Sequence, residues 1–187
     1  QDIHADFRND YPMNRLIQGD VGSGKTIVAI LVTALAVGNN VQVAIMVPTE
    51  VLARQHYDSF KLQLDKANIR CELILGNMKK NERSNILAGL EDGSISVVIG
   101  THALIQKDVF FNNLGLVVID EQHRFGVNQR ANLIDKGKSP HCLAMTATPI
   151  PRTLSITYYG DMDISIIDEL PLNRIPVVTR VVEPDRL

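Results

Sequence analysis

The sequence has no tryptophan and only two cysteines, and these shortages narrow what the chain can be. Cys71 and Cys142 lie in separate apolar stretches without a CxxC pattern or a histidine at metal-ligand spacing. We therefore expect buried thiols in a reducing compartment, not a disulfide framework or a zinc site. No apolar run approaches the roughly 20 residues that a membrane span needs, and the start shows no signal peptide pattern. We expect a cytoplasmic protein that contacts no membrane.

An excess of basic residues is also missing. The chain carries 19 Lys and Arg against 21 Asp and Glu, a net charge of −2, so it has no general attraction to nucleic acid. Nucleic-acid binding would need a local patch or further segments. Hydrophobic residues, in contrast, make up 45% of the 187 positions, which is enough for the core of one domain. Because the first residue is Gln1 and not Met, we expect a segment of a longer protein.

The most specific motif is the stretch 19–26, Gly-Asp-Val-Gly-Ser-Gly-Lys-Thr, which matches the phosphate-binding loop pattern G-x-x-x-x-G-K-[ST]. Its glycines allow a tight turn whose N–H groups face phosphate oxygens. Lys25 can reach the β- and γ-phosphates, and the Thr26 hydroxyl can hold Mg²⁺. The predicted nucleotide-binding residues are Gly19, Asp20, Val21, Gly22, Ser23, Gly24, Lys25 and Thr26.

The surroundings of this loop strengthen the assignment. An apolar run ending at Leu16-Ile17 indicates a buried strand before the loop. Apolar residues at helical spacing then indicate a helix after it, with one face formed by Ile27, Ile30, Leu31, Ala34 and Leu35. The helix directs the positive end of its dipole at the bound anion.

Strand-like and helix-like segments alternate along the rest of the chain. We predict strands at 13–18, 41–47, 71–75, 95–99, 116–119, 141–145 and 164–167, and helices at about 26–37, 49–65, 79–90 and 128–136. Thr49 is the expected N-cap of the second of these helices. The alternation predicts an α/β fold with a parallel central sheet and helices on both faces. Ligands of such sheets gather at the carboxyl ends of the strands.

Two acidic residues follow the most apolar strand. Asp120 can hold the Mg²⁺ that bridges the phosphates, and Glu121 can orient and activate an attacking water. Alone, the pair could be an ordinary acidic strand end; beside a phosphate-binding loop, we interpret it as catalytic. Gln122 and His123 come next, and His123 lacks a second ligand at metal spacing. Two threonines after the sixth strand, Thr146 and Thr148, are either plain strand-end hydroxyls or a hydrogen-bond relay beside the carboxylates.

Taken together, these motifs resemble the first motor lobe of superfamily 2 helicases, a RecA-like P-loop fold. Three longer strings, DEQHRFGVNQR at 120–130, TATPIPRTL at 146–154 and IIDELPLNR at 166–174, are similar to the RecG family of bacterial branched-DNA helicases. The resemblance covers essentially the whole chain. Transcription-repair coupling factors are the nearest rival, but that family usually has Glu where this chain has Gln122, and it lacks the Glu-Leu-Pro of 169–171.

The resemblance implies a protein that hydrolyses ATP with Mg²⁺, translocates on double-stranded DNA and remodels branched DNA. It implies DNA contacts by Thr49, Arg54, Thr101 and His102, although Arg54 could equally be a solvated helix charge. It also implies coupling between nucleotide and DNA through Gln122, His123, Thr146 and Thr148.

The same resemblance sets the expected domain organisation. Residues 1–170 would form the ATP-binding lobe and 171–187 a linker, with the wedge domain and the second motor lobe, including its arginine finger, elsewhere in the longer chain. Two other functions stay open: a nucleotide-switch binding module that never moves on DNA, and a small-molecule P-loop kinase. Glu121 weakens the kinase interpretation, because a carboxylate directed at water favours hydrolysis.

Overall fold

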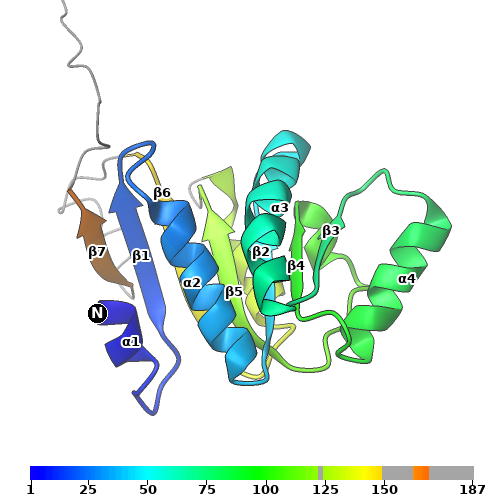
Figure 1. Cartoon of the computed structure of the whole chain (residues 1–187), viewed down its shortest axis with the longest axis horizontal. Coiled ribbons are helices and arrows are strands. Elements are labelled where there is room, and N and C mark those ends of the chain that lie inside the picture. The colour runs from blue at the N-terminus through cyan, green and yellow to red at the C-terminus, as the bar shows by residue number, and fades with distance from the viewer. Residues whose placement is uncertain (122–123, 149–161, 169–187) are drawn as a thin grey trace, which may run out of the picture.

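The structure, a computed structural model, describes residues 1–121, 124–148 and 162–168 of the chain. Within these ranges seven strands form one sheet: β1 Asn14–Gly19, β2 Gln42–Met46, β3 Cys71–Ile74, β4 Val97–Gly100, β5 Leu114–Asp120, β6 His141–Thr146 and β7 Asp163–Ile167. All neighbours pair in parallel, in the order β3-β4-β2-β5-β6-β1-β7 (Figure 1). The predicted parallel α/β fold and all seven predicted strands are confirmed.

The helices connect these strands. They are α1 Asp2–Asp6, α2 Lys25–Gly38, α3 Glu50–Leu64, α4 Lys80–Glu91 and α5 Val127–Ile134, with short 3-10 turns η1 Asp65–Ala67 and η2 His102–Ile105. The four predicted helices α2 to α5 are confirmed within about two residues at each end. Thr49 caps α3 as predicted: its Oγ1 accepts a hydrogen bond from Leu52 N at 3.3 Å. The sequence pattern did not predict the two 3-10 turns.

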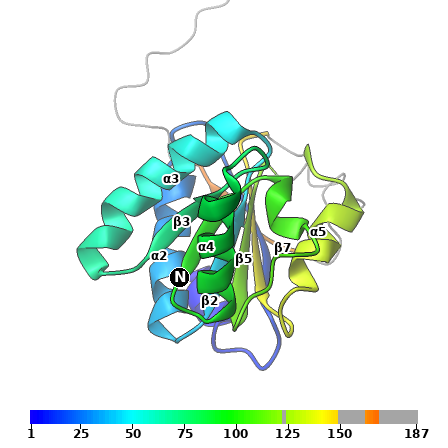
Figure 2. The ribbon, with the colours of Figure 1, turned by 90° about the vertical axis from the view of Figure 1, so that its right-hand side faces the viewer.

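The buried strands carry apolar side chains on both faces, as a covered parallel sheet requires. In β2, Val43 and Ile45 pack into a core under α2 and α3, whereas Ala44 and Met46 pack into a second core with residues of α4, η2 and α5. Figure 2 shows α2 and α3 on one side of the sheet and α5 on the other. Both thiols are buried as expected, with Cys71 1% and Cys142 7% exposed. No helix of the described ranges is both long and apolar enough to cross a bilayer.

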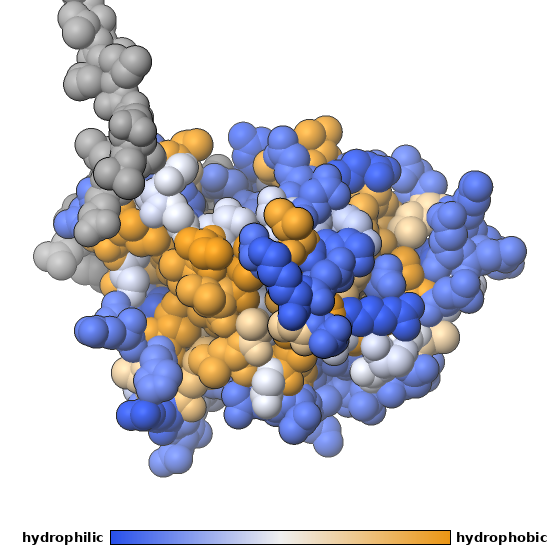
Figure 3. All heavy atoms as spheres, in the orientation of Figure 1, coloured by the Kyte–Doolittle hydropathy of each residue, from blue (hydrophilic) through white to orange (hydrophobic). Residues whose placement is uncertain are grey.

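Helix α2 differs from the expected pattern in the face that it buries. Ile30 is 7% exposed, but Ile27, Leu31 and Leu35 are 49%, 63% and 41% exposed. The residues that face the sheet are Ala29, Ile30, Val32, Thr33 and Ala36. Apolar atoms therefore gather on the surface that α2 presents (Figure 3). The helix is apolar almost all round, so the spacing of its apolar residues could not identify the buried face.

A buried ion pair ties α1 to the edge of the sheet. Arg15 of β1 donates from Nε and Nη2 to the two carboxylate oxygens of Asp6, the latter at 2.9 Å. Its Nη1 donates to Ser165 Oγ of β7 at 2.8 Å. Both charged side chains are almost fully covered, 11% exposed for Arg15 and 10% for Asp6. Arg15 thus links α1, β1 and β7 near the start of β1, at the end of that strand opposite the phosphate-binding loop.

Candidate active site

The predicted site residues follow five neighbouring strands at one edge of the sheet. In the order across the sheet, Thr101 follows β4, Thr49 lies three residues after β2, Asp120 ends β5, Thr146 ends β6 and the loop 19–26 begins at the end of β1. The sheet therefore brings the phosphate-binding loop close to the two carboxylates, with the predicted DNA-contacting residues on the other side of them. Gln122 and His123 lie outside the described residues, as does the predicted linker 171–187.

The phosphate-binding loop has the backbone that its glycines permit. Gly22 and Gly24 have φ angles of 80° and 97°, in the left-handed region that glycine adopts without a steric penalty. Gly24 is the N-cap of α2, and no side chain caps the first turn of that helix. The first N–H groups of α2 are thus left to an anion. Ser23 Oγ is buried without a hydrogen-bond partner among the described residues, so the loop holds a polar atom that a ligand can satisfy.

Lys25 is held by the loop itself. Its Nζ donates to the backbone carbonyls of Gly19, at 2.7 Å, and Asp20, at 2.8 Å. These two hydrogen bonds join the lysine side chain to the backbone at the start of the loop. The Asp20 carboxylate in turn accepts from Val21 N at 2.7 Å. An ammonium with three donors can move from carbonyls to phosphate oxygens without leaving the loop.

The carboxylate of Asp120 is oriented from two sides. Its Oδ1 accepts from Glu121 N at 3.0 Å, and its Oδ2 lies 2.8 Å from Nε2 of His56 on α3. No sequence motif indicated His56. A signal was present, because His56 lies on the same buried face of α3 as the apolar residues Ala53, Phe60 and Leu64. A buried polar side chain on such a face needs a hydrogen-bond partner.

Glu121 contacts the threonine motif after β6. Thr146 Oγ1 donates to Glu121 Oε2 at 3.3 Å, and Ala147 N lies 3.4 Å from Oε1. Thr148 N donates to the same Thr146 hydroxyl at 3.1 Å. The buried Thr146 hydroxyl thus contacts both the Glu121 carboxylate and the backbone N–H of the exposed Thr148, and the relay between them stays a prediction.

The four predicted DNA-contacting residues differ in exposure. Thr49, Arg54 and His102 are exposed, and Arg54 lies on α3, the helix that also holds His56. Thr101 is 3% exposed and its hydroxyl is buried without a partner in the described ranges. The Thr101 hydroxyl is therefore not on the surface in this conformation, and a contact between Thr101 and DNA stays a prediction. The reason is local: η2 begins directly after Thr101 and folds Ala103 and Leu104 into the core, which covers the residue before them.

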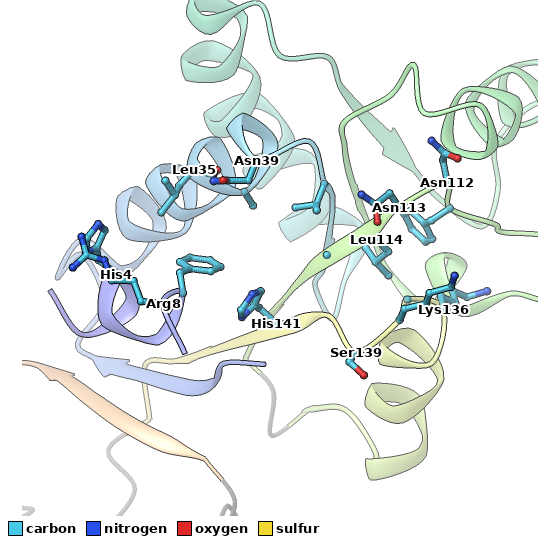
Figure 4. A pocket seen from close by; sticks show the side chains of 17 residues that line it. His4, Arg8, Leu35, Asn39, Asn112, Asn113, Leu114, Lys136, Ser139 and His141 are labelled. Carbon is cyan, nitrogen blue, oxygen red and sulfur yellow. Dashed lines mark hydrogen bonds between the residues drawn. The ribbon is translucent and has the colours of Figure 1, made fainter. Parts of the chain in front are cut away.

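A separate cavity of about 620 Å³ lies at the opposite edge of the sheet, before the strands β5 and β6 begin. Figure 4 shows it between α1, the end of α2 and the segment around Lys136, with His141 on its wall. His141 Nδ1 accepts from Met13 N at 2.9 Å, and its ring meets Phe7 edge-on, with 4.5 Å between ring centroids. Burial lowers the pKa of His141 below its ordinary 6.5. No predicted site residue lines this cavity.

Comparisons with known proteins agree with the geometry. The chain is 54% identical over 183 residues to the ATP-dependent DNA helicase RecG of Aquifex aeolicus, and 52% identical over 187 residues to that of Streptococcus pneumoniae. These alignments cover 97% and 100% of this chain but 23% and 28% of the relatives, so the chain spans about a quarter of their length. The predicted resemblance to the RecG family is thereby confirmed.

Solved structures give the same result. The structure of RecG bound to a three-way DNA junction matches with a TM-score of 0.86 at 49% identity, over 100% of this chain and 25% of that one. The Hef helicase domain of Pyrococcus furiosus matches with a TM-score of 0.65 at 24% identity, over 83% of this chain and 35% of that one, which shows the fold alone. A family model described as DEAD/DEAH box helicase matches residues 7–156, a range that includes the phosphate-binding loop and both carboxylates. The chain therefore belongs to the DEAD/DEAH box helicase family.

Proposed function

We propose that this chain is the MgATP-hydrolysing first motor lobe of a RecG-like helicase that translocates on double-stranded DNA and remodels branched DNA. One observation carries the proposal: the phosphate-binding loop follows β1, the carboxylates Asp120 and Glu121 follow β5, and Thr146 at the end of the strand between them, β6, donates a hydrogen bond to Glu121. The similarity to RecG proteins supports the DNA substrate. Acting on DNA, such a motor would work in the cytoplasm.

The roles of the ATP-site residues follow from their positions. Lys25, which donates to the carbonyls of Gly19 and Asp20, would donate to β- and γ-phosphate oxygens when ATP is bound and offset their charge. Thr26 and Asp120 supply oxygen ligands of the kind that Mg²⁺ prefers, and bound Mg²⁺ would neutralise charge on the phosphates. Glu121 accepts a proton from the attacking water, and its bonds to Thr146 and Ala147 fix the direction of the carboxylate.

Exposed residues beside these carboxylates would contact DNA. Thr49 and Arg54 follow β2, and His102 follows β4, both on the far side of β5 from the phosphate-binding loop. A guanidinium and a helix N-terminus are common partners of DNA phosphates, which position a strand without reading its sequence. We propose these three residues as part of the DNA track, with Gln122, His123, Thr146 and Thr148 coupling it to the nucleotide.

The rest of the motor would come from other parts of a longer chain. RecG relatives are about four times as long as the matched region. We propose that residues 1–170 form the lobe and 171–187 a linker, and that a second lobe supplies an arginine finger while a wedge domain splits the DNA arms. A translocase like the transcription-repair coupling factors is the main alternative. A nucleotide-switch module is a further one, and it would hydrolyse ATP at a rate that DNA does not change.

The test uses the intact parent protein. We expect Lys25→Ala to reduce ATP turnover to background, both with and without a branched DNA junction, because the cation at the γ-phosphate is lost while the loop backbone stays. The matched control is Lys66→Ala, which removes an η1 lysine that donates to Gln63 Oε1 and is not among the predicted site residues. Circular dichroism checks that both variants fold. Normal turnover by Lys25→Ala would refute the assignment of the loop, and wild-type turnover that ignores DNA would favour the switch module.

A further inference from the structure

His56 links α3 to the predicted magnesium site. The ring is 8% exposed, and its Nε2 lies 2.8 Å from Asp120 Oδ2. Because a carboxylate only accepts hydrogen bonds, Nε2 carries the proton and donates. The other ring nitrogen, Nδ1, is buried and has no partner among the described residues. The bond to Asp120 is therefore the single polar interaction that the structure gives this side chain in the described ranges.

His56 and the other predicted magnesium ligand, Thr26, line the same hollow. A hollow of about 510 Å³ lies between the start of α2 and the middle of α3, and its wall includes Thr26 and His56. The residue that contacts Asp120 thus borders the hollow into which Thr26 also faces, at the start of α2.

We propose that His56 is a positioning residue for the magnesium site: it holds the Asp120 carboxylate so that its free lone pairs face the metal bound with ATP. The proposal rests on the proposed function. Outer partners of metal ligands act in this way, by fixing the orientation of the ligand and strengthening it as a base. Because its polar contact in the described ranges is with Asp120, the effect of His56 on the metal would pass through that carboxylate.

The position of His56 on α3 gives the bond a second consequence. Arg54 lies two residues earlier on the same helix and points to solvent, where the proposed DNA track runs. A rigid helix that shifts when Arg54 binds a phosphate also shifts His56 against Asp120. DNA binding would therefore change the affinity for Mg²⁺-nucleotide, and by linkage the nucleotide would change the affinity for DNA equally.

Three variants of the intact parent test this inference. His56→Leu removes the donor, whereas His56→Gln keeps an N–H donor at nearly the same reach. Phe60→Leu is the matched control, because Phe60 is buried on the same helix next to His56, with 6.0 Å between ring centroids, but has no polar group that could bond to Asp120. For each we would measure the binding of a fluorescent ADP as Mg²⁺ is titrated, with and without a branched junction, and the thermal midpoint.

We expect His56→Leu to raise the Mg²⁺ concentration for half-maximal binding by about 10-fold or more, the usual effect of removing an outer partner. Binding of Mg²⁺-free ADP should stay near wild type, and the junction should no longer change the Mg²⁺ requirement. His56→Gln should stay within a small factor of wild type. Phe60→Leu should lower the thermal midpoint and leave the Mg²⁺ requirement unchanged.

An unchanged Mg²⁺ requirement in His56→Leu, or an equal shift in Phe60→Leu, would overturn the proposal, since either result means that His56 only packs. If His56→Leu does not fold, His56→Gln decides. The inference is supported if the junction changes the Mg²⁺ requirement of His56→Gln as it does in the wild type, and it is overturned if the junction no longer changes that requirement. Failure of the proposed function is distinguishable. In that case ADP binding by the wild-type parent would not depend on Mg²⁺, or the Lys25→Ala variant would bind ADP as the wild type does.

Discussion

Glu121 has a backbone φ of 48°, in a region that residues other than glycine, asparagine and aspartate rarely adopt. Such a conformation costs on the order of 1–3 kcal/mol and persists only where the surroundings enforce it. Here Asp120 Oδ1 holds the N–H of Glu121, and Thr146 with Ala147 holds its carboxylate. The turn directs the carboxylate away from the strand and towards the neighbouring strand end, where the proposed reaction takes place.

Replacing that carboxylate by an amide should separate binding from hydrolysis. We expect Glu121→Gln in the intact parent to bind MgATP normally and to hydrolyse it at least about 100-fold more slowly, a common contribution of a general base. Single-turnover hydrolysis and equilibrium nucleotide binding measure the two effects. Glu91→Gln, at the end of α4, serves as the control. Loss of binding together with hydrolysis would mean that Glu121 is a structural residue or a metal ligand.

His141 should make the stability of the chain depend on pH. Burial lowers its pKa in the folded state, so below pH 6.5 the unfolded chain binds a proton that the folded chain resists. The free energy of unfolding should therefore fall as pH decreases through 6.5 and be unaffected by this group above it. Urea unfolding between pH 5 and 8 measures the effect. His141→Gln should flatten this part of the profile; a profile with the slope of the wild type would contradict the assignment.

At the scale of elements, the sequence predicted the strands and helices well but not how each helix is oriented. Alternating apolar and polar segments determine where elements begin and end, and these boundaries were within a few residues. The face that α2 buries could not be found, because the exposed Leu31 is as apolar as the buried Ile30. Likewise, local spacing could not predict that η2 buries Thr101 or that His56 of α3 meets Asp120 of β5, since both depend on packing between distant segments.

The pair Asp6–Arg15 is the main polar contact between α1 and the sheet. We expect Asp6→Asn to lower the free energy of unfolding by about 3–5 kcal/mol, because the covered Arg15 guanidinium loses its buried charged partner and keeps only the exposed Asp2 and Asp163 carboxylates, each 3.9 Å away. Asp163→Asn should have a much smaller effect, since Asp163 is 69% exposed and lies 3.9 Å from Arg15. Urea denaturation of the chain measures both. Equal losses in the two variants would show that the buried pair is no more important than the exposed contact.

At the scale of the whole molecule, this chain should bind nucleotide but turn it over poorly. Its net charge of −2 gives no general attraction to a duplex, and one lobe offers few phosphate contacts. An arginine finger from a second lobe can contribute on the order of 10³–10⁵ in rate. We therefore expect residues 1–187 to fold, bind MgATP weakly and show ATPase activity near background that branched DNA barely stimulates.

Steady-state phosphate release by the purified chain, with and without a Holliday junction at low and physiological salt, measures this. Strong stimulation by DNA would show that the lobe completes its own site, for example by self-association through the exposed apolar residues Ile27, Leu31 and Leu35 of α2. In that case the ATPase rate per protein molecule would increase with protein concentration.

The strand order also has a consequence for biosynthesis. A ribosome releases β1 before every other strand, but the two neighbours of β1 in the sheet, β6 and β7, emerge only after β2, β3, β4 and β5. The four intervening strands are contiguous in the sheet and can pair with one another as they emerge, whereas β1 stays unpaired until β6 and β7 emerge. The phosphate-binding loop is therefore translated early and assembled late. A chain that ends before His141 could fold this part of the sheet but would lack an assembled nucleotide-binding site. Binding of ATP would therefore distinguish completed lobes from nascent ones.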